Sequence, residues 1–177
     1  MKQILLVFSA TMIMLSSCTS VKFESAQPKD KEELKEFPDN VLGIYIDTER
    51  DTLILTSNSF QYGNKKSSIF RVDGTLTSGE SILKRDNDYY VLSLKDENGW
   101  EVITFKYSGK DLTVYYIDLG KDREKTIKKL KGILAVKEVK DSEGKVDYYL
   151  INPSGKEFET LMAKNIFSRV TTFTRVK

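Results

Sequence analysis

The chain has 177 residues, and its 28 Lys and Arg residues nearly balance its 26 Asp and Glu residues. A net charge of +2 makes no strong field, so we expect no nucleic-acid partner. The sequence has no His and only one Cys, Cys18. This inventory excludes Ser-His-Asp and Cys-His nucleophile systems and zinc sites built from His or Cys. We therefore predict no catalytic residue of these classes, no metal site and no cofactor, and we favour a non-catalytic protein.

The chain begins with the features of a secretory signal peptide. Lys2 precedes an apolar run from Ile4 to Leu15, which ends in small residues before Cys18. A basic start, a short apolar run and small residues at a cleavage point are typical of such signals. The run is too short to predict a membrane span.

The stretch Leu15-Ser16-Ser17-Cys18 resembles the lipobox of bacterial lipoproteins. The resemblance covers only the first eighteen residues. It implies that residues 1–17 are removed, and that Cys18 carries a thioether-linked diacylglycerol and an N-acyl chain, which together would anchor the protein stably to a lipid bilayer. In such lipoproteins an Asp after the Cys favours the inner membrane, so Thr19 favours the outer membrane, with the periplasmic or outer face left open. The alternative is an ordinary signal peptide that ends in a cysteine by chance.

Residues 18–40 have the composition of a lipidated N-terminus followed by a flexible tether. Pro28, a charged run over residues 29–33 and Pro38 leave little apolar surface to bury. We expect the globular domain to occupy residues 41–177.

From residue 41 onward, short runs of strand-forming residues alternate with turn signals. We predict strands over residues 41–46, 52–56, 59–62, 68–72, 75–77, 81–84, 89–95, 100–107 and 112–119. Asp73-Gly74 predicts a hairpin turn, and Asn98-Gly99 predicts another. Parallel strands would need crossover helices, which this region lacks, so we predict an antiparallel meander.

Helical signals come late in the chain. Asp122 can cap a helix that runs to about Lys131, and Ser154 and Glu157 have capping-box spacing at the start of a second helix. Strands are predicted over residues 133–139, 146–151 and 167–176. The predicted fold class is therefore mainly β, with one antiparallel meander as a barrel or strongly curved sheet and two short helices packed on it.

Carboxylates cluster at several predicted turns, which leaves acid–base or calcium chemistry to be weighed. None of the clusters has the register of a calcium loop, and Asp and Asn favour turns for backbone reasons alone. We interpret the clusters as solvated turns and keep a hydrolase that uses Asp and Glu without His as the alternative. The clusters are Asp47/Glu49/Asp51, Asp86/Asp88, Asp96/Glu97 and Asp141/Glu143/Asp147.

Three tyrosine doublets occur within predicted strands: Tyr89-Tyr90, Tyr115-Tyr116 and Tyr148-Tyr149. Neighbours in a strand point to opposite faces, so one ring of each doublet is exposed or lines a second cavity if the other is in the core. Tyr and Trp suit recognition because they combine apolar area with a polar tip. The candidate binding residues are Tyr89, Trp100, Tyr115 and Tyr149. The alternative is that both faces of the sheet are covered, one of them by the helices.

Gly43-Ile44-Tyr45 in the first predicted strand, the meander, a late helix and Arg175 in the last strand resemble the layout of lipocalin-like barrels. In that group a Gly-x-Trp motif in the first strand packs under an Arg from the last strand, and here Tyr45 stands in place of the Trp. The predicted helix near residues 122–131 departs from the group. The resemblance implies a calyx, a cup-shaped cavity that takes a small apolar ligand.

The sequence therefore predicts a membrane-anchored lipoprotein with a non-catalytic binding or structural role in the cell envelope. Its partners would be the bilayer, through acylated Cys18, and either a small apolar ligand or an envelope protein. An apolar calyx would favour a carrier, and a flat Tyr-rich face would favour a protein partner. Converging carboxylates with raised pKa values would favour the hydrolase.

Overall fold

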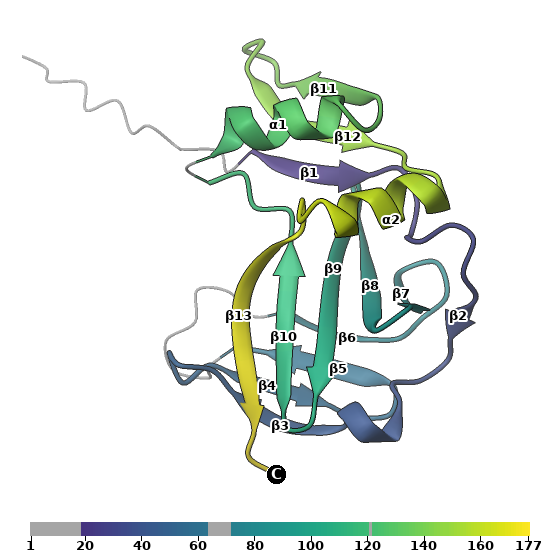
Figure 1. Ribbon diagram of the computed structural model, residues 1–177, viewed down its shortest axis with the longest axis vertical. Coiled ribbons are helices and arrows are strands. Elements are labelled where there is room, and N and C mark those ends of the chain that lie inside the picture. The colour runs from purple at the N-terminus through teal and green to yellow at the C-terminus, as the bar shows by residue number, and fades with distance from the viewer. Residues whose placement is uncertain (1–18, 64–71, 121) are drawn as a thin grey trace, which may run out of the picture.

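The computed structural model describes residues 19–63, 72–120 and 122–177, so the predicted signal peptide, Cys18 and the start of the predicted 68–72 strand lie outside the described residues (Figure 1). Within these ranges the predicted fold class is confirmed, because one largely antiparallel sheet curls into a half-barrel with two helices packed on it. The strands are β1 (Ser20–Phe23), β2 (Glu33–Leu34), β3 (Gly43–Ile46), β4 (Thr52–Leu55), β5 (Ser59–Tyr62), β6 (Val72–Thr75), β7 (Ser81–Asp86), β8 (Tyr89–Asp96), β9 (Gly99–Ser108), β10 (Asp111–Tyr116), β11 (Val136–Lys140), β12 (Val146–Ile151) and β13 (Ser168–Arg175). The helices are α1 (Arg123–Lys131), α2 (Gly155–Ala163) and a 3₁₀ turn, η1 (Asp39–Val41).

Two meanders make the half-barrel, and the last strand joins them. β3, β4, β5 and β6 pair in chain order, as do β7, β8, β9 and β10. β13 lies between β10 and β3 and connects the two meanders into one sheet. Figure 1 shows β1, β11, β12 and α1 above this half-barrel, with α2 at the junction. We call these five elements the upper unit.

Each face of the central strands β8 and β9 packs against a different hydrophobic cluster. Leu92 and Phe105 point into the half-barrel and belong to the lower cluster. Val91 and Val102 point the other way and pack with Phe158 of α2 in the upper cluster. Since neighbouring residues of a strand face opposite sides, burial on both faces requires apolar side chains at successive positions. The alternative interpretation, in which both faces of the sheet are covered, is confirmed for these strands.

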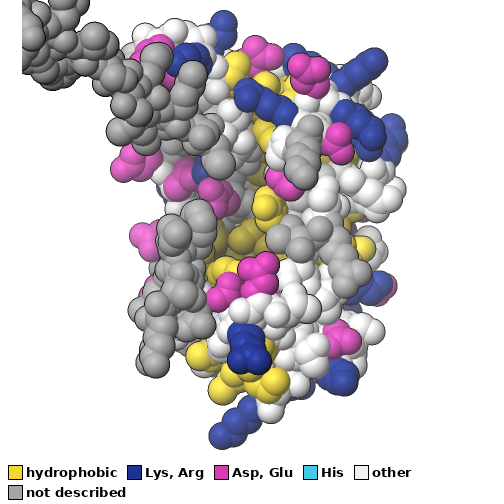
Figure 2. Space-filling view, turned by 90° about the vertical axis from the view of Figure 1, so that its left-hand side faces the viewer, with side chains coloured by type: hydrophobic (Ala, Val, Ile, Leu, Met, Phe, Trp, Pro, Cys, Tyr) yellow, Lys and Arg dark blue, Asp and Glu magenta, His cyan; other side chains and the backbone are white. Residues whose placement is uncertain are grey.

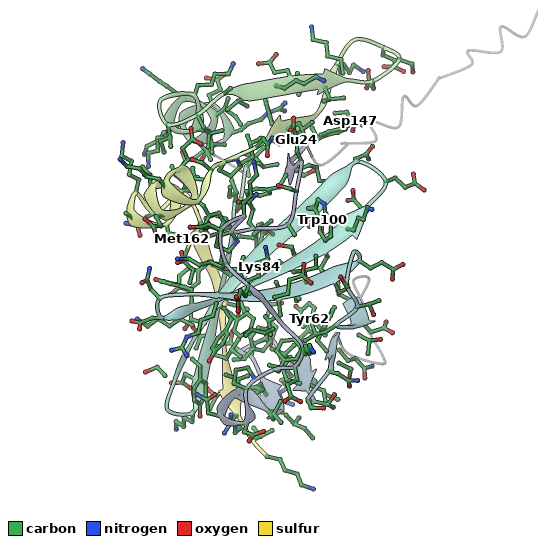
Figure 3. All side chains as sticks on the ribbon, turned by 90° about the vertical axis from the view of Figure 1, so that its right-hand side faces the viewer. Glu24, Tyr62, Lys84, Trp100, Asp147 and Met162 are labelled. Carbon is green, nitrogen blue, oxygen red and sulfur yellow. The ribbon has the colours of Figure 1, made fainter. Side chains whose placement is uncertain are left out.

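The N-terminal segment is part of the fold, and the prediction of a flexible tether over residues 18–40 is wrong for the described part. β1 pairs in parallel with β12 and meets β9 at Phe23, which is 1% exposed. The segment then crosses the outside of the sheet (Figure 3), pairs with β7 through β2, and places Phe37, also 1% exposed, in the lower cluster. The charged run 29–33 suggested a tether, but apolar residues on both sides of it are buried.

A buried lysine helps to hold β1 in place. The Nζ atom of Lys22 pairs with Asp96 and, at 2.6 Å, with Glu101, so β1 is linked to β8 and β9 by charge as well as by backbone bonds. Burial alone would lower the pKa of Lys22, but the hydrogen bonds that it donates to Asp96 and Glu101, together with their negative charges, outweigh burial and raise the pKa. The lysine therefore stays charged inside the sheet because both carboxylates accompany it.

The parallel pairing of β1 with β12 is an exception within the antiparallel sheet. No separate crossover helix is needed, because almost the whole domain lies between these two strands in the sequence. The antiparallel prediction therefore holds for the meanders and not for the strand pair that joins the N-terminal segment to the upper unit.

The predicted hairpin turn at Asp73-Gly74 is also wrong. Both residues lie inside β6, where they pair with Gln61 and Phe60 of β5. A Cβ atom on Gly74 would lie 2.6 Å from the Cζ atom of Phe60. The glycine therefore makes room for an aromatic ring across the ladder rather than forming a turn.

Both predicted helices are present. The capping box of α2 is complete, because the Glu157 carboxylate accepts from the Ser154 backbone N–H at 2.8 Å and the Ser154 hydroxyl accepts from the Glu157 N–H. Asp122 precedes α1, although its side chain makes no capping hydrogen bond. None of the described helices is long and apolar enough to cross a membrane.

Because Phe23 is buried, a substitution there tests whether the N-terminal segment contributes to the stability of the fold. We expect Phe23→Ala to lower the free energy of unfolding by about 3–5 kcal/mol, because it removes a ring from the upper cluster and leaves a cavity. Val176→Ala is the control, since Val176 is 57% exposed and should change stability by less than about 0.5 kcal/mol. Urea unfolding measures both variants, and equal midpoints would restore the tether interpretation.

Candidate functional site

The half-barrel contains an apolar cavity of about 240 Å³, which we call the calyx. Its walls come from both meanders and from β13, with one residue, Phe37, from the N-terminal segment. The lining side chains are hydrophobic except for Thr171. They are Phe37, Leu53, Leu55, Phe60, Tyr62, Val72, Leu92, Leu94, Ile103, Phe105, Leu112, Val114, Tyr116, Thr171 and Phe173.

Strand alternation explains why these residues meet. Leu92 and Leu94 are two apart on β8, as are Ile103 and Phe105 on β9 and Leu112 and Val114 on β10. Residues two apart in a strand share a face, so each strand contributes every second side chain to the calyx. The curl of the sheet then turns these inner faces toward one another, and the space between them is not filled completely.

At the lower end of the half-barrel an arginine lies between two tyrosine rings. The guanidinium carbon of Arg175 lies 5.2 Å from the ring centre of Tyr45 and 5.0 Å from that of Tyr107. Arg175 also donates to the Tyr45 hydroxyl at 2.7 Å and to the carbonyl of Asn40. The Tyr45 hydroxyl in turn donates to the carbonyl of Val41 at 2.7 Å, which ties η1 to the end of the half-barrel.

This arrangement contains the contact that the lipocalin resemblance implied, with Tyr45 in place of the Trp. Tyr45 and Arg175 are direct partners across the β3–β13 ladder. Gly43 is required beside them, because its φ is +145° and a Cβ atom there would lie 2.6 Å from the carbonyl oxygen of Lys177. Burial raises the pKa of Tyr45, and the hydrogen bond from Arg175 offsets part of that rise.

The structure brings two of the predicted binding residues together. Tyr89 of β8 and Tyr115 of β10 meet edge to face on the outer side of the half-barrel, with ring centres 5.9 Å apart. Lys106 lies 5.6 Å from the Tyr89 ring centre and pairs with Asp88 at 2.9 Å. We call Asp88, Tyr89, Lys106 and Tyr115 the outer tyrosine patch.

The other two predicted binding residues lie elsewhere. Trp100 stands near the upper unit, well away from Tyr62 of the half-barrel (Figure 3), and its ring lies under the Nζ atom of Lys95 at 5.9 Å. Tyr149 is 7% exposed and belongs to the upper cluster, and its hydroxyl accepts from Arg123 at 3.3 Å. Trp100 and Tyr149 therefore do not extend the outer tyrosine patch into a single recognition face.

Most of the predicted carboxylate clusters lie in turns, where an Asp carboxylate accepts hydrogen bonds from nearby backbone N–H groups. Asp47 accepts backbone N–H bonds from Glu49 and Asp51 at 3.0 and 2.9 Å, and Asp141 accepts two in the same way within its own turn. Among the residues that the structure describes, no group of three or more His, Cys, Asp or Glu is placed to hold a metal ion.

The carboxyl pKa shifts resolved in the described residues give the hydrolase alternative no support. Hydrogen bonds from Lys106, Lys131 and Ser154 lower the pKa values of their carboxylate partners. A general acid needs a raised pKa instead. The three partners are Asp88, Glu138 and Glu157.

Comparison with known proteins adds no family. No protein-family model matches the chain, and searches of curated proteins and of solved structures find no significant match. The features of this chain that bear on its function are therefore the calyx, the outer tyrosine patch and the N-terminal stretch Leu15-Ser16-Ser17-Cys18.

The Tyr45 hydroxyl generates a test with a defined pH dependence. We expect Tyr45→Phe to lower the free energy of unfolding by about 1–3 kcal/mol near neutral pH, because Arg175 and the Val41 carbonyl lose their partner. A raised pKa in the folded state means that stability is complete below the unfolded pKa of about 10 and is lost as pH rises above it. The variant should therefore lose less stability than the wild type between about pH 8 and pH 11.

The control for this test is Tyr148→Phe at a half-exposed position. Denaturant unfolding at about pH 8 and at about pH 11 measures the free energy of unfolding of the wild type and of both variants. Two results together would contradict the described role of the Tyr45 hydroxyl: equal losses of stability in Tyr45→Phe and Tyr148→Phe at neutral pH, and the same alkaline slope in both variants as in the wild type.

Proposed function

We propose that this protein is a lipid-anchored protein of the bacterial cell envelope whose half-barrel binds a small apolar ligand. The observation that carries the binding function is the calyx, an apolar hollow lined by strands from both meanders. The proposed anchor rests on Leu15-Ser16-Ser17-Cys18, and the proposed outer-membrane location rests on Thr19 after the cysteine.

The size and chemistry of the calyx define the ligand class. An apolar cavity of about 150 Å³ is already enough to bind benzene, and the calyx is larger at about 240 Å³. It is smaller than the roughly 300–1,000 Å³ of pockets that take drug-sized molecules. A polar group pushed into the hydrophobic lining would lose its hydrogen bonds to water. The calyx therefore suits a small apolar molecule or the apolar part of a larger one.

The outer tyrosine patch supports a second candidate function, contact with an envelope protein. Tyr89 and Tyr115 are half-buried, so each offers part of an aromatic ring beside the charges of Lys106 and Asp88. Tyrosines next to a polar rim are typical of recognition surfaces. The calyx remains the stronger basis for function, because protein interiors are close-packed and leave few voids larger than a water molecule, whereas this hollow measures about 240 Å³.

Filling the calyx tests the binding function. We expect a chain of residues 19–177, which holds every described element, to bind the uncharged fluorophore N-phenyl-1-naphthylamine saturably. Val114→Phe places a larger side chain on the calyx wall and should weaken binding about tenfold or more. Fluorescence titration measures the affinity, and circular dichroism with a thermal melt checks that each protein is folded.

The matched control is Val176→Phe, the same change at an exposed position outside the calyx. It should leave the affinity of the probe unchanged. Absence of saturable binding to the wild-type chain, or equal weakening by both variants, would falsify the proposed ligand site.

The anchor is tested separately at Cys18. We expect Cys18→Ser to abolish incorporation of labelled palmitate and to leave the protein unprocessed or in the soluble fraction, because a serine has no thiol for the thioether. Metabolic labelling and fractionation of the cell envelope measure both effects. Unchanged labelling and unchanged membrane fractionation would contradict the lipobox prediction.

A further inference from the structure

A second hollow begins at the first described residue, directly after the predicted acylation site. It has a volume of about 550 Å³ and lies between β1, the start of β9 and the segment that leads from β10 to α1. We call it the anchor groove and define it by Thr19–Val21, Phe23, Glu101–Ile103, Tyr116–Gly120 and Arg123. Figure 2 shows hydrophobic side chains in a hollow midway along one face of the molecule.

The anchor groove and the calyx share a wall. Ile103 of β9 and Tyr116 of β10 line both hollows. They stand next to each other at the end of the β9–β10 ladder, one position beyond the final pair of Thr104 with Tyr115. Ile103 is half-buried and Tyr116 is 40% exposed, so this wall lies between the solvent and the interior of the half-barrel. A molecule that reaches the calyx from the groove passes these two side chains.

The two hollows differ in chemistry in a way that suits an amphiphile. The calyx holds roughly eight methylene groups if each takes about the 30 Å³ of a water molecule in the liquid. This volume accommodates part of one acyl chain and not two chains side by side. The anchor groove has an apolar floor that includes Val21 and Ile117, and it also carries the charged side chains of Glu101, Asp118 and Arg123. A chain therefore fits the calyx, and a polar head group fits the groove.

The position of the groove along the chain places it near the proposed anchor. Thr19 is the only residue between Cys18 and β1, and its hydroxyl donates to the Val146 carbonyl at 3.3 Å. If Cys18 is acylated as proposed, the bilayer begins one residue from the groove. Exposed Lys125, Lys128 and Lys129 lie on α1, which Figure 1 shows beside β1, and lysines near a membrane surface are attracted to anionic lipids.

We infer that the anchor groove is the entrance of the calyx, and that a single-chain amphiphile from the bilayer enters it with the end of its chain first. The inference rests on the proposed function, since it needs both the anchor and a calyx that accepts apolar groups. The bound amphiphile has its chain end against Phe105 and Val114, which pair across the β9–β10 ladder two positions beyond Ile103 and Tyr116. Its head group lies between β1 and the Tyr116–Gly120 segment. Ile103 and Tyr116 contact the part of the acyl chain that lies between its end and the head group.

Photolabelling of the full acylated chain in vesicles tests this arrangement. The vesicles contain phosphatidylethanolamine, phosphatidylglycerol and a fatty acid that carries a diazirine either at the end of its chain or next to its carboxyl group. We expect the chain-end probe to label calyx residues and the carboxyl-side probe to label anchor-groove residues, as mapped by peptide mass spectrometry. Ile103→Trp narrows the shared wall, so it should lower chain-end labelling of the calyx about tenfold while groove labelling persists.

The control variant is Ile54→Trp, the same change at a half-buried position on the outer face of β4. It should leave both labelling patterns unchanged. Three results would overturn the inference: the reverse pattern of labelling, no labelling in the groove, or equal effects of the two Trp variants. Labelling that appears only in Cys18→Ser would also overturn it, because the protein's own acyl chain would then occupy the groove.

Failure of this inference can be told apart from failure of the proposed function. If N-phenyl-1-naphthylamine binds the 19–177 chain and Val114→Phe weakens that binding, the calyx accepts apolar groups whatever the photolabelling shows. A negative photolabelling result would then reject only the entrance from the bilayer side.

Discussion

The structure depends on burying both faces of the two long central strands. β8 and β9 have apolar side chains on each side, so one sheet face alone cannot remove them from water. The β3–β6 meander and β13 curl around one face, and β1, β12 and α2 with their neighbours cover the other. Burial of apolar surface contributes roughly 25 cal/mol per Å², so two partial cores on a shared pair of strands stabilise what neither could alone.

The calyx follows from this division. The upper cluster packs rings such as Phe23, Phe158 and Phe167 against one another, with the ring centres of Phe158 and Phe167 5.6 Å apart. The inner face of the half-barrel is instead curved, and its side chains point toward a common space that they do not fill. An apolar cavity costs stability through lost contacts, which a protein tolerates when a ligand restores them. Arg175 lies between Tyr45 and Tyr107 and so links β13 to β3 and β9 at the lower end of the half-barrel.

Much of the fold could be predicted because it depends on local patterns. Alternation located most of the strands, and the Ser154–Glu157 spacing located α2 together with its cap. The Gly43-Ile44-Tyr45 motif and Arg175 were recognised as a pair from the layout alone, and they do meet. Each of these features is encoded within a few residues, or within a motif whose partner lies in the last strand.

The predictions failed where the deciding contact is distant in sequence. Val21 and Phe23 lie before a charged run, and only β12, more than a hundred residues later, makes their burial favourable. The sequence around Gly74 is typical of a turn, and only the position of Phe60 on the neighbouring strand shows why a glycine is needed there. The calyx could be expected only in outline, because its volume depends on how far the sheet curls. The tyrosine doublets showed that one ring of each pair would leave the core, but not that Tyr149 would be the ring that stays inside.

The most direct measurement of the central claim is a methyl NMR titration of residues 19–177 under xenon pressure, since xenon enters apolar cavities. The account predicts saturable shifts for methyl groups of Leu53, Leu94 and Val114, which line the calyx, and none for Leu130 and Leu161 of the upper cluster. Unchanged calyx methyl groups, or equal shifts in both clusters, would contradict it.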